Sequence, residues 1–64
     1  DIGQNIRLAE TIGNESLRRR AIGITATAWM RQDKEAAGQY LDTTEALNDK
    51  SRARIKRFAE GGGH

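Results

Sequence analysis

The chain has 64 residues, with 11 Lys and Arg against 9 Asp and Glu, no Cys, no Pro and one His at position 64. These numbers exclude a disulfide framework, a thiolate or multi-histidine metal site within the chain, and a cysteine nucleophile. They also limit the chain to one domain or a piece of one, with a hydrophobic content of 36% that makes an independent core marginal.

The first predicted element is a helix over residues 2–32, because Ala, Arg, Glu, Gln and Leu are frequent and Pro is absent. Apolar or small residues recur every three or four positions along one face, a spacing typical of a helical hairpin or coiled coil. These residues are Ile2, Ile6, Ala9, Gly13, Leu17, Ala21, Ile24 and Ala28. Arg20 and Arg31 fall on the same face, where their stems can cover apolar surface or their charges can pair with acids of another chain.

A second apolar set on this helix points in another direction. Its members are Leu8, Ile12, Ile22, Trp29 and Met30. A helix that is apolar on more than one side is usually buried on more than one side. We therefore predict a partner interface formed by Ile22, Gly23, Trp29 and Met30, with small residues allowing close approach. The alternative is that Trp29 and Met30 complete the core of the hairpin itself.

One alternative divides this helix near its first third. Gly13 is followed by Asn14, so a short helix can end at Gly13 and a second can begin at Glu15 with Asn14 as its cap. We favour the continuous helix because its apolar face runs through this point.

The second predicted element is a helix over residues 33–60. Asp33 suits its N-cap and Gly61 its C-cap. The apolar stripe contains Ala37, Tyr40, Leu41, Thr44, Leu47, Ser51, Ile55, Phe58 and Ala59. A break between Gly38 and Asp42 is the alternative, since Asp42 and Glu45 have the spacing of a helix cap. Residues 61–64 are predicted to be a flexible Gly-rich tail.

Together these elements predict an all-α fold, a long antiparallel two-helix hairpin. The face of Ile6, Leu17 and Ile24 is expected to pack against the stripe of Leu41, Leu47, Ile55 and Phe58. Because two helices cannot cover the surplus apolar surface, we expect oligomerisation or a partner to complete a multi-helix bundle. No apolar run approaches the roughly 20 residues that a membrane span requires.

Charge is unevenly distributed along the chain. Five acids and one base lie between residues 33 and 49, whereas five bases and no acid lie between residues 50 and 57. Either this pattern complements a helix macrodipole, or the bases contact phosphates. The candidate phosphate contacts are Arg18, Arg19, Arg20, Lys50, Arg52, Arg54, Lys56 and Arg57.

The functional prediction is a non-enzymatic structural or interaction protein that self-associates or docks into a larger assembly. No nucleophile–base set, cofactor motif or metal-ligand motif occurs, so we expect no enzyme activity, cofactor or metal. The first alternative is a small basic nucleic-acid-binding module, and the second is an antitoxin- or inhibitor-like partner protein. Asp1 in place of Met suits a processed chain or a piece of a longer one, and no compartment is indicated.

Overall fold

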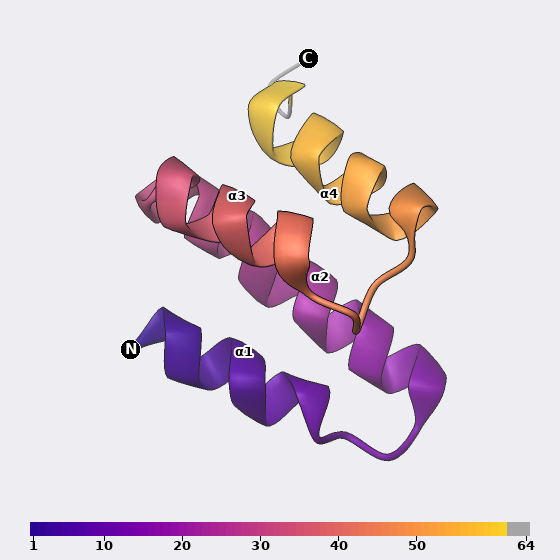
Figure 1. The fold of residues 1–64 in the computed structure, drawn as a ribbon. Helices are drawn as coiled ribbons and strands as arrows, with labels where there is room; N and C mark the ends of the chain where they lie inside the picture. The colour runs from indigo at the N-terminus through magenta and orange to yellow at the C-terminus, as the bar shows by residue number, and fades with distance from the viewer. Residues whose placement is uncertain (62–64) are drawn as a thin grey trace.

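The computed structural model describes residues 1–61, and all regular structure within that range is helical (Figure 1). The helices are α1 (Ile2–Glu10), α2 (Glu15–Gln32), α3 (Lys34–Thr43) and α4 (Asp49–Gly61). The all-α prediction is therefore confirmed. Of the predicted tail, Gly61 is the last residue of α4 and residues 62–64 lie outside the described range.

Two breaks divide the two long helices that the sequence predicted. Residues 2–32 form α1 and α2, separated by residues 11–14, so the continuous helix was wrong and the break beside Gly13 occurs. Residues 33–60 are divided at residues 44–48, whereas Gly38 lies inside α3. The alternative site for this second break, at residues 38–42, was therefore also wrong.

Side-chain caps explain where the helices begin. The Oδ1 atom of Asn14 accepts a hydrogen bond from the Leu17 amide at 3.0 Å, and Asn48 does the same for Ser51 at 2.8 Å. Asp1 and Asp33 cap α1 and α3 through their carboxylates. An Asp or Asn side chain that binds a free backbone amide favours a new helix start over continuation of the preceding helix.

The four helices form two successive helix–loop–helix units of the same design: the first unit is α1–α2 and the second is α3–α4. Arg18 and Arg52 occupy matching positions, 34 residues apart. Arg18 donates to the carbonyl of Ile12 and Arg52 to that of Leu47, each at 2.9 Å, and both carbonyls lie in the loop of their unit. Helical repeats of roughly this length stack because one helix pair cannot bury its own apolar face.

Helix α2 lies at the centre of the molecule and contacts the other three helices, with α1 and α4 on opposite sides of it (Figure 1). Helices α2 and α4 run in the same direction in this arrangement (Figure 1). The buried core consists of Ile6, Ala9, Ile22, Ala26, Met30, Ala37, Leu41, Leu47 and Ile55. The predicted burial of Leu41, Leu47 and Ile55 is therefore confirmed.

The buried face of α2 differs from the predicted one. Ile22, Ala26 and Met30 face the core at intervals of four residues, whereas Leu17 and Ile24 are 56% and 66% exposed. The loop of residues 11–14 releases α2 from the helical register of α1, so α2 turns its other apolar stripe inward. Of the face that was expected to be buried, Ile6 is buried, but the prediction was wrong for Leu17 and Ile24. Phe58, which was expected to pack in the second stripe, is also exposed.

The two units meet through an aromatic and polar contact. The rings of Trp29 and Tyr40 lie 5.6 Å apart between centroids. The Tyr40 hydroxyl donates a hydrogen bond to the Glu10 carboxylate, which also accepts from Thr44. These contacts join the second unit to the first beside the apolar core that both units share. Within residues 1–61, no helix combines the length and apolar character that crossing a membrane requires.

Candidate functional site

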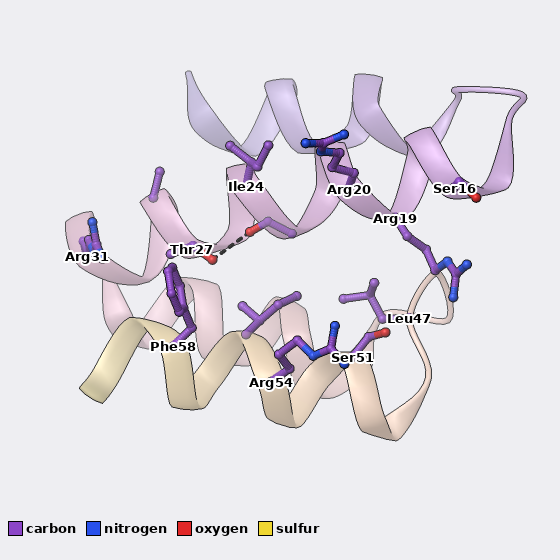
Figure 2. Close-up of a pocket in the computed structure, with 13 residues that line it drawn as sticks. Ser16, Arg19, Arg20, Ile24, Thr27, Arg31, Leu47, Ser51, Arg54 and Phe58 are labelled. Carbon is purple, nitrogen blue, oxygen red and sulfur yellow. Dashed lines mark hydrogen bonds between the residues drawn. The ribbon is translucent and has the colours of Figure 1, made fainter. Parts of the chain in front are cut away.

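A groove between α2 and α4 is a concave feature of the described residues. Its volume is about 780 Å³. It is lined by Ser16, Arg19, Arg20, Gly23, Ile24, Thr27, Ala28, Arg31, Leu47, Ser51, Arg54, Ile55 and Phe58 (Figure 2). Because α2 contributes eight of these residues and α4 most of the others, the groove depends on the packing of the two units against each other.

The floor and walls of the groove are apolar. Leu47 and Ile55 are buried at its base, whereas Ile24 and Phe58 are 66% and 60% exposed. The Phe58 ring extends from α4 toward α2, and Thr27 of α2 lines the same groove (Figure 2). The Thr27 hydroxyl donates to the Gly23 carbonyl at 2.7 Å, so its hydrogen-bonding capacity is partly met within α2. The groove therefore offers apolar contacts at its centre.

Four arginines border this apolar surface: Arg19, Arg20 and Arg31 on α2, and Arg54 on α4. Within residues 1–61, no Asp or Glu lines the groove. Within residues 1–61, the ion pairs are Lys34 with Glu60, Arg52 with Asp49 and Lys56 with Asp42. The groove arginines belong to none of these, so no carboxylate of the described residues forms an ion pair with them.

Matching positions of the two units supply the groove with equivalent pairs of side chains, each an arginine and a large apolar residue. Arg20 and Ile24 are four residues apart on α2, and Arg54 and Phe58 are four residues apart on α4. Each member of the second pair follows its counterpart by 34 residues. Residues at i and i+4 share a helix face, so each unit presents one guanidinium and one large apolar side chain to the groove.

Most of the predicted partner interface lies elsewhere. Ile22 and Met30 are buried in the core of the chain, so they are not on a free surface. Trp29 packs against Tyr40 at the junction of the units. Gly23 lines the groove, and a Cβ atom there would have no neighbour within 4 Å. Of the four residues, the structure therefore places only Gly23 on the groove.

The eight predicted phosphate contacts are divided among several environments. Arg19, Arg20 and Arg54 meet at the groove. Arg18 and Arg52 bind loop carbonyls, and Lys56 pairs with Asp42. Lys50 and Arg57 are exposed on α4 outside the groove. The structure thus brings three of these eight residues together and adds Arg31 to them.

Titratable groups that could perform chemistry are sparse in the described residues. Residues 1–61 contain no cluster of three Asp, Glu, His or Cys side chains able to hold a metal ion. Burial, followed by the hydrogen bond to Glu10, raises the pKa of Tyr40 from 10.0 to about 12. Tyr40 is therefore a protonated hydrogen-bond donor at neutral pH, which suits its place at the junction of the units.

Sequence reasoning missed Ile24, Arg31 and Phe58 as groove residues, because it placed Ile24 and Phe58 in the core. The signal that marks the groove is an Arg followed four residues later by a large apolar residue, repeated after 34 residues. This pattern can be recognised only once the first residues of α2 and α4 are known.

No known protein family matches this chain, and neither a curated protein nor a solved structure matches it. Its function therefore has to be inferred from the chemistry of its own residues.

Proposed function

We propose that this chain is a non-enzymatic helical module that joins a larger assembly by docking another polypeptide in the groove between α2 and α4. The observation that carries the proposal is the exposure of Ile24 and Phe58 beside the buried floor of Leu47 and Ile55. Large apolar side chains gathered in a concave surface are typical of interaction sites, because their removal from water stabilises a complex.

The groove is a better candidate than the other exposed apolar residues. Leu8 on α1 and Leu17 on α2 are also exposed, but neither lines the groove. Single apolar residues on a surface are common in proteins that bind nothing there. Ile24 and Phe58 differ because they flank one opening, rimmed by arginines that can orient a partner.

The test compares a groove variant with a matched surface variant. The double change Ile24→Ser and Phe58→Ser alters only exposed side chains, so we expect folding stability to move by about 0.5 kcal/mol per site at most. Leu8→Ser is the control, because Leu8 is 67% exposed and lies on α1. Binding is measured by fluorescence anisotropy with amphipathic helical peptides of acidic, neutral and basic charge, and self-association by sedimentation at several concentrations.

We expect either peptide binding or self-association, weakened about tenfold or more by the groove variant and unchanged by Leu8→Ser. A chain that stays monomeric and binds none of the peptides contradicts the proposal. So does an equal loss in both variants.

A second candidate function is contact with nucleic-acid phosphates, favoured by the convergence of Arg19, Arg20 and Arg54. Such binding would weaken steeply with added salt, because bound phosphates release counterions. It leaves the exposed Phe58 ring without a role unless a base stacks on it. An absence of binding to single-stranded or duplex oligonucleotides at low salt removes this candidate.

A further inference from the structure

We propose that the occupant of the groove is an acidic amphipathic α-helix supplied by a different polypeptide. This inference rests on the proposed docking function and specifies the chemistry of the partner. Three observations support it: the apolar contacts that the groove offers, the arginines that line it, and the charge and exposure of the chain's own helices.

The apolar contacts favour a helical occupant. Ile24 and Phe58 lie on two helices that run in the same direction and flank one groove. An amphipathic helix presents apolar side chains at i, i+3 or i+4, and i+7 along one face, so it can contact both walls and the floor together. On α2 the lining residues extend from Ser16 to Arg31, about 22 Å of helix at 1.5 Å per residue, so an occupant of about 20 residues is long enough to fill the groove.

The charges favour an acidic occupant. Among the described residues, the groove is lined by four guanidinium groups and no carboxylate. Arginine binds carboxylates with two parallel hydrogen bonds, and this geometry adds specificity to the attraction. Because guanidiniums lie on both α2 and α4, Asp and Glu residues on the two flanks of an incoming helix can each reach one.

A second copy of this chain fits the groove poorly. Within residues 1–61 the exposed large apolar residues lie on α1, α2 and α4. Helices α2 and α4 are basic, and α1 has one basic and one acidic residue. Helix α3 belongs to the acidic stretch of the chain, but its apolar residues Ala37 and Leu41 are buried. None of these helices offers an exposed apolar face together with an excess of acids.

The experiment uses three helical peptides of about 20 residues that share one apolar face and carry Glu, Gln or Lys at the flanking positions. Affinity for the full chain is measured by fluorescence anisotropy at low and high salt. The test variant is Arg20→Gln with Arg54→Gln. The control is Lys50→Gln with Arg57→Gln, which removes the same net charge from exposed positions outside the groove.

We expect the Glu peptide to bind most tightly, and its affinity to fall roughly three- to tenfold in the Arg20/Arg54 variant. The Lys50/Arg57 control should retain the affinity of the unmodified chain, and the Gln peptide should not distinguish the two variants. Added salt should reduce the difference in affinity between the Glu and Gln peptides, because it screens the charges.

Equal affinity for the Glu and Gln peptides overturns the acidic class of partner while leaving the docking function in place. Tightest binding of the Lys peptide overturns it as well. Self-association that the Glu peptide cannot displace assigns the groove to a second copy, and tighter binding of a single-stranded oligonucleotide assigns it to nucleic acid. Failure of all three peptides, without self-association, removes the docking function itself.

Discussion

The two helix–loop–helix units share their internal construction and differ in what covers their outer residues. Asn14 and Asn48 cap the second helix of each unit, and Arg18 and Arg52 close each loop from within. Yet Leu8 of the first unit is exposed, whereas Tyr40 packs on Trp29, although each lies seven residues after the N-cap of its helix, Asp1 or Asp33. Local construction is therefore set by each unit, while the burial of its surface depends on its neighbour.

The same comparison explains the groove. Ile24 and Phe58 occupy matching positions, and both stay exposed because the stacking of the units leaves that side of α2 and α4 open. Repeated units commonly use such a continuous face for binding, since each contributes equivalent side chains to it.

The largest effect is expected from the contrast between Leu41 and Leu8. Leu41 of α3 is fully buried, so Leu41→Ala should destabilise the fold by about 2–5 kcal/mol through lost burial and a residual cavity. Leu8→Ala, on the exposed side of α1, should change stability by about 0.5 kcal/mol at most. Urea unfolding followed by circular dichroism measures both, and similar losses would contradict the assignment of the core.

The next effect concerns the caps that the units share. Asn14→Ala and Asn48→Ala should each cost about 1 kcal/mol, because each leaves a backbone amide of the first helical turn without its partner. Asn14→Asp and Asn48→Asp are matched controls that keep the accepting oxygen and should retain most of the stability. If one Ala variant were neutral in urea unfolding, the two units would not be equivalent in construction.

The third effect concerns the junction between the two units, where Tyr40 contacts Trp29 and Glu10. Tyr40→Phe removes the hydrogen bond to Glu10 and should cost about 0.5–1.5 kcal/mol. The pKa of Tyr40 is raised from 10.0 to about 12, so the protonated form is favoured in the folded state. The stability from this group is therefore complete below pH 10 and is lost as the pH rises through 12.

This pH dependence can be measured directly, because Tyr40 is the only tyrosine of the chain. Tyrosinate absorbance should show a midpoint well above the ordinary value in the folded chain and near 10.0 in urea. The stability of Tyr40→Phe should lack the alkaline loss. A folded-state midpoint at the ordinary value would mean that the junction does not form as described.

The sequence predicted part of this arrangement, for identifiable reasons. The absence of Pro and the frequent helix-forming residues predicted an all-helical fold. The helical spacing of apolar residues in 33–60 predicted the burial of Leu41, Leu47 and Ile55. The loop at residues 44–48 was missed because Leu47 keeps its place in the apolar stripe and still enters the core after the chain turns. Periodicity alone therefore did not reveal the break.

The groove could not be predicted, for a related reason. Once the loop of residues 11–14 interrupts the helix, the rotation of α2 is independent of α1, and the buried stripe changes from the Ile24 side to Ile22 and Met30. Which apolar face remains exposed is decided by the packing of α2 against three other helices. Single-helix patterns contain no information about that choice.

The most direct test of the central claim is a titration of the ¹⁵N-labelled chain with the Glu peptide, followed by amide chemical shifts. A docking groove predicts that the largest changes lie on α2 and α4 around Ile24, Thr27 and Phe58. The amides of α1 near Leu8 should stay unchanged, because Leu8 lies outside the groove. Changes centred on α1, or spread evenly over all four helices, would contradict the assignment of the groove as the docking site.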